Sequence, residues 1–506
     1  MWRNPGRLIG KGRKTWPGRQ LSTAAPESSY PGPGYVEKKP GLYQILSALR
    51  ATGGTVTKAL NDYQMEGRAI KRNELMRCVK ELRKFGHFDH SLEIMEWMEK
   101  RGINFAHGDL GVRLDLICKT KGIKEAENYF NGLPDWGKHL PTYGSLLNCY
   151  CKELDSEKAL QLFDKMDELQ LIKNSLPFNN MMSLYMRIRQ PEKVPDLVTQ
   201  MKQRNISPCT FTYSIWMHSL GQLKDMEGVD KVLEEMRGGG EDKTDWTTYS
   251  NLATVYTNAG DLERARSALK MVEQKLDSPN RQAYHFLITL YAGTGDLDEV
   301  HRVWGCIKSK FNQVTNSTYL VIIQALSRLN DVEGVSRLFA EWESACSSYD
   351  MKIANAAMKF YLERGMCEEA EMVFDGATKR TQGPYFRARE MMMISFLKRQ
   401  QLDSALQQMK AALAEIGVNQ KPWRPSQETV GAFFSFFEEE KDVSGAEKLV
   451  KILKQIEQCG YNVYRQLLKT YVAAGESAPG MRERLEGDGI EVDEELKKLL
   501  DMVEAA

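Results

Sequence analysis

Apolar residues recur along this chain with the spacing of amphipathic helices. Residues 246–280 show the pattern most clearly, because the apolar groups of their first half follow the i, i+3, i+4, i+7 spacing of one helix face, on Tyr249, Leu252, Ala253 and Tyr256. Gly260 can adopt the left-handed conformation that ends a helix, and Asp261 can cap the next one. A second apolar face follows and ends at the Ser278-Pro279 break. The stretch therefore predicts a helical hairpin.

The same hairpin pattern recurs about every 35 residues along most of the chain. The first helix carries an aromatic residue, at Tyr143, Phe178, Tyr213, Tyr249, Tyr284 and Tyr319. The second helix carries a small residue, at Ala159, Val194, Val229, Ala265, Val300, Val335, Ala370 and Ala405, and a bulky one four positions later, from Phe163 to Met409. A single hairpin cannot bury both faces, so neighbours must stack. The pattern predicts an all-α fold, an α-solenoid (superhelix) of about ten helix-turn-helix repeats of about 35 residues.

These motifs resemble those of a known family. The period, the T-Y-x-x-L pattern and the G-D-L-x-x-A turn are similar to pentatricopeptide repeats of the P-type, in which all repeats have this length, and the resemblance covers residues 72–475. Tetratricopeptide repeats are the nearest alternative, but their W-x₂-L-G-x₂-Y start is missing. The segments SLPFNNMMSLYM and TVTKALNDYQMEG further resemble a short plant mitochondrial subgroup that includes components of the mitochondrial ribosome.

The two ends of the chain differ from the repeats. The first 21 residues contain six Lys or Arg and no acidic residue, which is typical of an organelle transit peptide. The R-Q-L-S-T sequence at residues 19–23 resembles a mitochondrial processing site. We predict a mitochondrial location, with the chloroplast, or a disordered basic arm in place of a transit peptide, as alternatives. The expected organisation is a transit peptide (1–21), a flexible linker (22–40), an N-terminal helical cap (41–71), the repeat array (72–475) and a C-terminal helical tail (476–506).

Charge and cysteine spacing narrow the classes of function. The chain has a formal charge of +1, and subtracting the six positive charges of the first 21 residues leaves about −5, so contacts to nucleic acid must be local rather than set by bulk charge. The nine cysteines include no C-x-x-C pair and no H-x-E motif occurs, which excludes the usual zinc and deaminase sites, so we expect reduced packing cysteines.

No catalytic motif accompanies the repeats. A P-loop, a G-x-S-x-G elbow and an H-E-x-x-H pair are all missing, and no apolar run reaches the roughly 18 residues that a membrane helix needs. We therefore predict that the chain is not an enzyme, that it uses no cofactor or metal, and that it has neither a membrane partner nor a small-molecule substrate.

The family resemblance implies where RNA bases would be read, at the residue after the first-helix aromatic and at the last residue of each repeat. Only Ser250 with Asn280 matches a recognised pair, one that would favour adenine, whereas Gly144 and Leu320 cannot hydrogen-bond a base through their side chains. Weak base specificity is the expected result. The candidate base-facing residues are Asn179, Ser214, Thr244, Ser250, Asn280, His285, Thr315, Asp350 and Asn355.

Cations near the ends of the predicted first helices form a further column, at Lys84, Lys152, Arg187, Arg328 and Lys398. The resemblance implies contacts to RNA phosphates. A cation near a helix C-terminus is also favoured by about 0.3 to 1 kcal/mol without any ligand, so both interpretations stay open. Outside the aromatic column, which we assign to the core, Trp216, Trp246 and Trp342 are predicted to make exposed contacts.

Two functions follow from these observations. The first is a non-enzymatic organellar RNA-binding repeat protein with weak base specificity, acting in mitochondrial RNA processing or translation on single-stranded or ribosomal RNA. The alternative is a structural component of the mitochondrial ribosome or another protein-interaction scaffold, with mitochondrial ribosomal proteins as partners.

Overall fold

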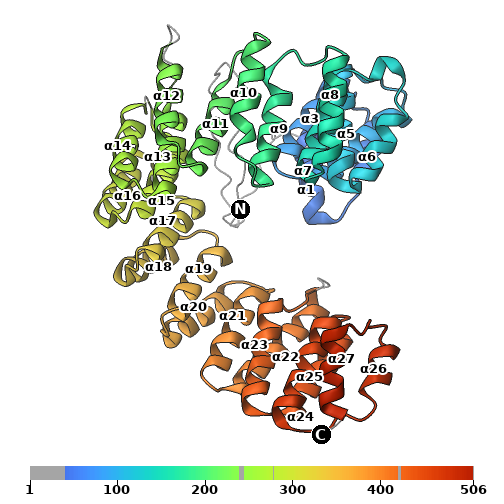
Figure 1. Cartoon of the computed structure of the whole chain (residues 1–506), viewed down its shortest axis with the longest axis vertical. Helices are drawn as coiled ribbons and strands as arrows, with labels where there is room; N and C mark the ends of the chain where they lie inside the picture. Colours follow the sequence, from blue (N-terminus) through green and yellow to red (C-terminus); the bar gives the residue numbers. More distant parts are fainter. Residues whose placement is uncertain (1–39, 239–243, 277, 420–422, 505–506) are drawn as a thin grey trace, which may run out of the picture. The chain divides into compact units, whose positions relative to one another are not determined.

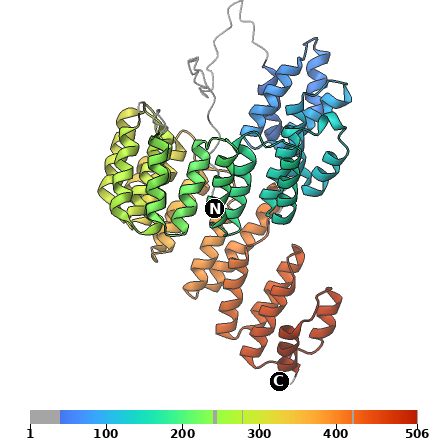
Figure 2. The same cartoon turned by 45° about the horizontal axis from the view of Figure 1, so that its top comes forward.

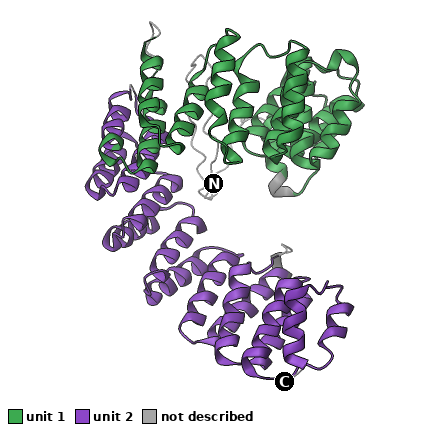
Figure 3. Ribbon diagram, viewed as in Figure 1, with its two compact units in different colours: residues 1–265 green, residues 266–506 purple. Residues whose placement is uncertain are grey.

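The computed structural model describes residues 40–238, 244–276, 278–419 and 423–504, and every regular element in these ranges is a helix (Figure 1). The prediction of an all-α fold is therefore confirmed. The chain divides into two compact units, residues 1–265 and 266–506 (Figure 3). The predicted transit peptide (1–21) lies outside the described residues, as does the predicted linker (22–40) apart from its last residue.

Unit 1 contains α1 (Leu42–Thr52), α2 (Val56–Met65), α3 (Arg72–Lys84), α4 (Phe88–Lys100), α5 (His107–Lys121), α6 (Ile123–Asn131), the 3₁₀ turn η1 (Asp135–Gly137), α7 (Leu140–Glu153), α8 (Ser156–Glu168), α9 (Ser175–Arg187), α10 (Lys193–Gln203), α11 (Thr210–Gln222), α12 (Met226–Arg237) and α13 (Trp246–Ala259). Helix α14 (Leu262–Gln274) contains the boundary between the units. Unit 2 continues with α15 (Arg281–Thr294), α16 (Leu297–Lys310), α17 (Asn316–Arg328), α18 (Val332–Ala345), α19 (Met351–Leu362), α20 (Cys367–Arg380), α21 (Phe386–Lys398), α22 (Leu402–Asn419), α23 (Gln427–Glu440), α24 (Val443–Gln455), α25 (Tyr461–Ala474), α26 (Met481–Gly487) and α27 (Glu494–Glu504).

Consecutive helices pair as hairpins within each unit. From α3 to α25 the odd-numbered helices are the first helices of the repeats, and the even-numbered helices are the second helices. In the described part of the chain, five such hairpins lie in unit 1, from α3/α4 to α11/α12, and five lie in unit 2, from α15/α16 to α23/α24. Each first helix from α5 to α11 and from α15 to α23 contacts the next first helix, so the hairpins of a unit follow one another in chain order (Figure 2). This arrangement is the predicted solenoid of stacked repeats.

The periodic columns of the sequence form the core. All eight small residues of the second-helix column are completely buried, and the six aromatic residues of the first-helix column are at most 7% exposed. The bulky residues fill the space toward the next hairpin: Phe163 meets Phe178 edge-on, with ring centroids 5.3 Å apart, and Trp304 meets Tyr319 at the same distance. Both predicted packing roles are confirmed.

Local caps fix where the helices begin and end. Gly260 ends α13 in the left-handed region, with φ of 82°, and Asp261 Oδ1 accepts the N–H of Arg264 at 3.1 Å, as the sequence predicts. Several first helices begin with a completely buried threonine whose hydroxyl accepts the N-cap N–H, such as Thr212 for α11, at 3.2 Å. These threonines therefore fix the residue at which each of these first helices begins.

The tryptophans outside the aromatic column differ from expectation. The prediction for Trp342 is wrong, because the residue is 1% exposed and its Nε1–H donates to Asn316 Oδ1 at 2.9 Å. Its ring packs beside Phe339, which lies one helical turn earlier on the same face of α18. Trp216 and Trp246 are half-buried.

Candidate nucleic-acid interface

The predicted last-residue readers are mostly helix N-caps. Asn280 Oδ1 accepts the N–H groups of Gln282 and Ala283 at the start of α15, at 3.0 and 3.4 Å. Asp350 Oδ1 accepts the N–H of Lys352 at the start of α19, at 2.9 Å. Thr315 is the N-cap of α17, and its hydroxyl bonds to Ser317 and Thr318. Thr244 is only 6% exposed. The side-chain oxygens of Asn280, Asp350 and Thr315 are therefore already bonded at the helix ends.

The readers that follow the aromatic column bond to the next hairpin. Asn179 is 4% exposed, its Oδ1 accepts from Thr212 Oγ1 at 2.8 Å, and its Nδ2 lies 3.5 Å from Cys209 Sγ. His285 Nε2 lies 2.9 Å from Thr318 Oγ1, which is the matching threonine of the next first helix. The structure thus places Asn179 beside Cys209, and both polar ends of its amide are engaged.

The smaller readers are also engaged within the protein. Ser214 donates to the Thr210 carbonyl at 3.0 Å and accepts from Asn251 Nδ2 at 2.7 Å. Ser250 is 4% exposed and donates to the carbonyl of Trp246 at 2.9 Å. Asn355 differs, because within the described residues its buried Oδ1 has no hydrogen-bond partner.

One reader position was not singled out by sequence. Glu390, on α21, carries a carboxylate that accepts from Trp423 Nε1 at 2.9 Å, from the Ser426 N–H at 3.1 Å and from Thr429 Oγ1 at 2.9 Å. The bond to Thr429 repeats the link seen from Asn179 and His285 to the buried threonine of the next first helix. Asn179, His285 and Glu390, which follow the aromatic position, therefore each link one hairpin to the next by a hydrogen bond.

The five predicted phosphate contacts share one location. Each lies in the last turn of a first helix and is exposed, at Lys84 on α3, Lys152 on α7, Arg187 on α9, Arg328 on α17 and Lys398 on α21. The guanidinium of Arg187 donates to the carbonyls of Cys151 and Lys152, both at 3.0 Å, and so caps the C-terminal end of α7. In the described ranges, Arg328 and Lys398 make no ion pair.

A buried carboxylate organises further cations in unit 1. Asp115 on α5 accepts from Arg83 Nη2 and from Lys119 Nζ, both at 2.7 Å, and Lys152 Nζ lies 3.8 Å from its second oxygen. Burial alone would raise the pKa of Asp115, but the hydrogen bonds and charges of these cations outweigh it and lower the pKa. One ionised carboxylate therefore holds three cations from α3, α5 and α7.

We name the resulting strip the cationic track. It contains Arg83, Lys84, Lys119, Lys152 and Arg187, from four successive first helices. Contacts connect its parts, because Arg83, Lys119 and Lys152 meet at Asp115 and Arg187 bonds to the Lys152 carbonyl. Asp115 contacts three of the five cations, and the head groups of Lys84, Lys152 and Arg187 are exposed.

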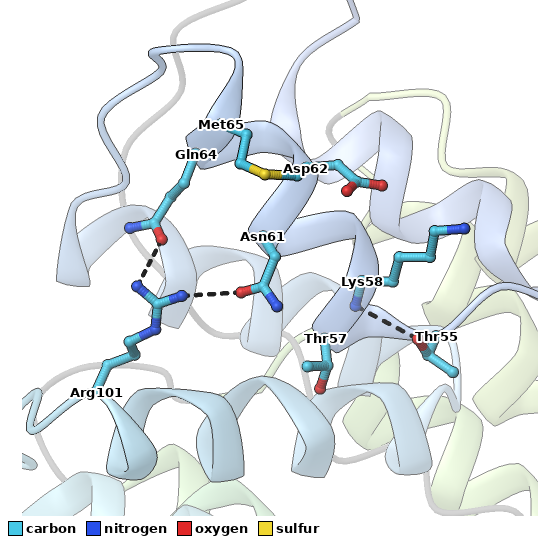
Figure 4. A pocket seen from close by; sticks show the side chains of 8 residues that line it. All are labelled: Thr55, Thr57, Lys58, Asn61, Asp62, Gln64, Met65 and Arg101. Atoms are coloured by element: carbon cyan, nitrogen blue, oxygen red, sulfur yellow. Dashed lines mark hydrogen bonds between the residues drawn. The ribbon is translucent and has the colours of Figure 1, made fainter.

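A pocket of about 730 Å³ lies between α2 and the end of α4 (Figure 4). Arg101 reaches across it and donates to Gln64 Oε1 at 2.9 Å and to Asn61 Oδ1 at 3.0 Å. The lining contains neither a cysteine nor a histidine, and the side-chain oxygens of its two amides, Asn61 and Gln64, accept hydrogen bonds from Arg101. Elsewhere in the described ranges, no cluster of three His, Cys, Asp or Glu could hold a metal ion, and no helix is long and apolar enough to span a membrane.

Stacked helical hairpins whose first helices carry the polar and cationic side chains define a helical repeat protein. The PPR repeat family model matches residues 173–222, the PPR repeat model matches 141–171, 211–241 and 317–346, and the pentatricopeptide repeat domain model matches 231–294. A mitochondrial pentatricopeptide repeat-containing protein of Arabidopsis thaliana is 49% identical over 463 residues, which cover 91% of this chain and 86% of the relative. The chain belongs to the pentatricopeptide repeat family.

The chain is also similar to a ribosomal relative and to a solved structure. The Arabidopsis thaliana large ribosomal subunit protein mL101 (rPPR4) is 38% identical, over 93% of this chain and 95% of the relative. The crystal structure of the maize pentatricopeptide repeat protein PPR10 covers 91% of this chain and 72% of its own, with 16% identity and a TM-score of 0.44. The predicted mitochondrial location is confirmed by relatives named as mitochondrial, and membership of this repeat family agrees with the prediction that the chain is not an enzyme.

Proposed function

We propose that this chain binds single-stranded or ribosomal RNA mainly through its phosphates, with weak base specificity, and acts in mitochondrial RNA processing or translation. The observation that carries the proposal is the cationic track, which gathers five cations from four successive first helices. A phosphate backbone presents charges at regular intervals and is held by such a row without base recognition.

The helix dipole explains only part of the track. It accounts for a single cation near each helix end, as for Arg187 on the carbonyls of α7. It does not require three cations around Asp115, where one would neutralise the carboxylate. Weak base specificity is supported by the engaged amide of Asn179 and by the capping role of Asn280.

Replacing Lys84, Lys152 and Arg187 together by Gln tests the proposal. The affinity for single-stranded RNA should fall about tenfold or more at low salt, and the slope of log affinity against log salt should flatten by about 2, since each lost phosphate contact removes about 0.7. Filter binding over a salt series measures both quantities.

A matched control removes the same charge elsewhere. Lys124, Lys165 and Lys231 are exposed on the second helices α6, α8 and α12, and their replacement by Gln should leave both the affinity and the slope close to wild type. An unchanged affinity in the first variant, with a wild-type circular dichroism spectrum, would remove the track from the RNA interface.

A structural role in the mitochondrial ribosome is the second candidate, favoured by the 38% identity to a large ribosomal subunit protein. Sedimentation of mitochondrial extract with and without RNase separates the two roles. Co-migration with a ribosomal subunit supports the structural role, whereas a light complex that RNase dissolves supports RNA processing.

A further inference from the structure

Three aromatic side chains meet at the N-terminal ends of α5 and α7. His107 is the first residue of α5, His139 is the N-cap of α7, and Trp136 lies in the η1 turn that leads into α7. The His107 and His139 rings meet edge-on with centroids 4.6 Å apart, and the Trp136 ring lies 6.0 Å from His107. We name these three residues the aromatic cluster.

Close helix packing holds the aromatic cluster together. A Cβ atom on Gly111 would lie 2.6 Å from the Pro141 carbonyl oxygen, so only glycine lets α5 approach the first turn of α7 this closely. The buried Thr142 hydroxyl donates to the Gly137 carbonyl at 2.8 Å and fixes the η1 turn. The rings are therefore positioned by backbone contacts rather than by their own packing.

Trp136 faces water to an unusual degree. It is 56% exposed, whereas Trp97, Trp304, Trp342 and Trp423 are at most 7% exposed. Within the described residues, no other large apolar side chain between Phe85 and Leu154 is exposed. A single exposed apolar residue is normal at a surface, but Trp136 lies beside the His107 ring, which in turn meets His139, so the three side chains together provide an open aromatic face with polar edges.

The aromatic cluster lies at the N-terminal ends of the first helices. His139 is the N-cap of α7, the position that Cys209 occupies on α11 and Asn280 on α15. Lys152 lies at the other end of the 14-residue helix α7. At about 1.5 Å of rise per residue, no single nucleotide spans the distance from the aromatic cluster to the cationic track.

We propose that His107, Trp136 and His139 form a stacking platform for an unpaired base of the bound RNA, an inference that rests on the proposed function. Every base has a π-face, so stacking on tryptophan holds a base without selecting its identity. A protein partner is disfavoured, because interface cores bring several apolar side chains together, and Trp136 is bordered by the charged residues Asp135 and Lys138.

Trp136→Ala in the full chain tests the platform against short oligoadenylate and oligouridylate. Loss of one stacked base should weaken binding about fivefold or more at every salt concentration while the salt slope stays at its wild-type value. Trp136→Phe should stay within about twofold of wild type, because phenylalanine keeps a stacking face. Met372→Ala is the matched control, since Met372 is 66% exposed on the second helix α20.

Two further readouts separate the platform from the proposed function. RNA should quench tryptophan emission in the wild type and much less in Trp136→Phe, and an abasic oligonucleotide should bind wild type and Trp136→Ala equally. If wild type binds RNA and Trp136→Ala binds it equally well, the platform is overturned while the proposed function stands. If Trp136→Ala also loses a protein that co-purifies with wild type, the aromatic cluster binds a protein rather than RNA. A wild-type chain that binds no RNA would overturn both proposals.

Discussion

The two ends of the first helices use their polar groups in opposite ways. At the N-terminal ends, the Asn280 oxygen caps its own helix and the Asn179 amide bonds to Thr212 of the next hairpin. At the C-terminal ends, Lys84, Lys152 and Arg187 remain exposed. The amide groups of Asn179 and Asn280 hold helices and repeats together, whereas the cations at the other end keep charge available for a partner.

Helix physics explains the difference. Unpaired N–H groups at a helix N-terminus are satisfied by short side chains with oxygen atoms, and such a bond leaves little of the side chain for a ligand. Unpaired carbonyls at a C-terminus attract Lys and Arg, whose long side chains can keep their charged heads in water. Side chains in the base-reading positions are therefore easily used up in hydrogen bonds within the protein, whereas the cations in the phosphate-binding positions keep their charged groups exposed.

The largest predicted effect concerns the carboxylate of the cationic track. Asp115→Asn leaves Arg83, Lys119 and Lys152 without their shared counter-charge, so the free energy of unfolding should fall by about 3 to 5 kcal/mol at neutral pH. Urea unfolding followed by circular dichroism measures this loss. Asp164→Asn removes an exposed carboxylate from α8 and should change stability by less than about 0.5 kcal/mol.

The same variant has a pH signature. Because the folded protein lowers the pKa of Asp115, its contribution is present above the ordinary carboxyl pKa and is lost as pH falls through the lowered value. The difference in the free energy of unfolding between wild type and Asp115→Asn should therefore become smaller under acid conditions. Equal stability of the two proteins at neutral pH would show that the carboxylate does not organise the track.

A smaller effect is expected at the other end of the first helices. Asn179→Ala deprives the buried Thr212 hydroxyl of its acceptor, so stability should fall by about 1 to 3 kcal/mol. Base preference should not change, because the amide is already engaged within the protein. Selection from a random RNA pool before and after the substitution compares the preferences, and a shifted motif would show that Asn179 reads a base after all.

The smallest effect is a change in one reaction rate. Burial would raise the pKa of Cys209, but hydrogen bonds from Thr212, Ser175 and Asn179 outweigh it and lower the pKa to about 7. This exposed thiol should therefore be the first cysteine to react with iodoacetamide, more slowly as pH falls below about 7. Bound RNA should slow the reaction, as peptide mapping would reveal. An undiminished rate would place the RNA away from this end of α11.

Sequence alone predicts the repeat and its core, because every repeat buries the same positions. The small column from Ala159 to Ala405 is completely buried as predicted. Burial of Trp342 was also accessible from sequence, since it lies one turn after Phe339 and shares its apolar face. Capping by Asn280 and Asp350 follows from their residue types ahead of a helix.

Contacts between repeats could not be predicted in the same way. The bond from Asn179 to Thr212 joins residues 33 positions apart, and it depends on how two hairpins stack. Asp115 interrupts an apolar run on a helix that is buried on nearly all sides, and its three cations come from different first helices. The aromatic cluster likewise depends on the approach of α5 to α7 at Gly111.

The edge-on contacts between successive hairpins have an evolutionary consequence. The contacts of Phe163 with Phe178 and of Trp304 with Tyr319 are of one kind. In each, the bulky residue of one hairpin's second helix packs against the aromatic residue of the next hairpin's first helix. Duplicating or deleting a whole module restores the same junction, whereas removing part of one does not. The array can therefore gain or lose whole hairpins during evolution without changes to the residues of its core.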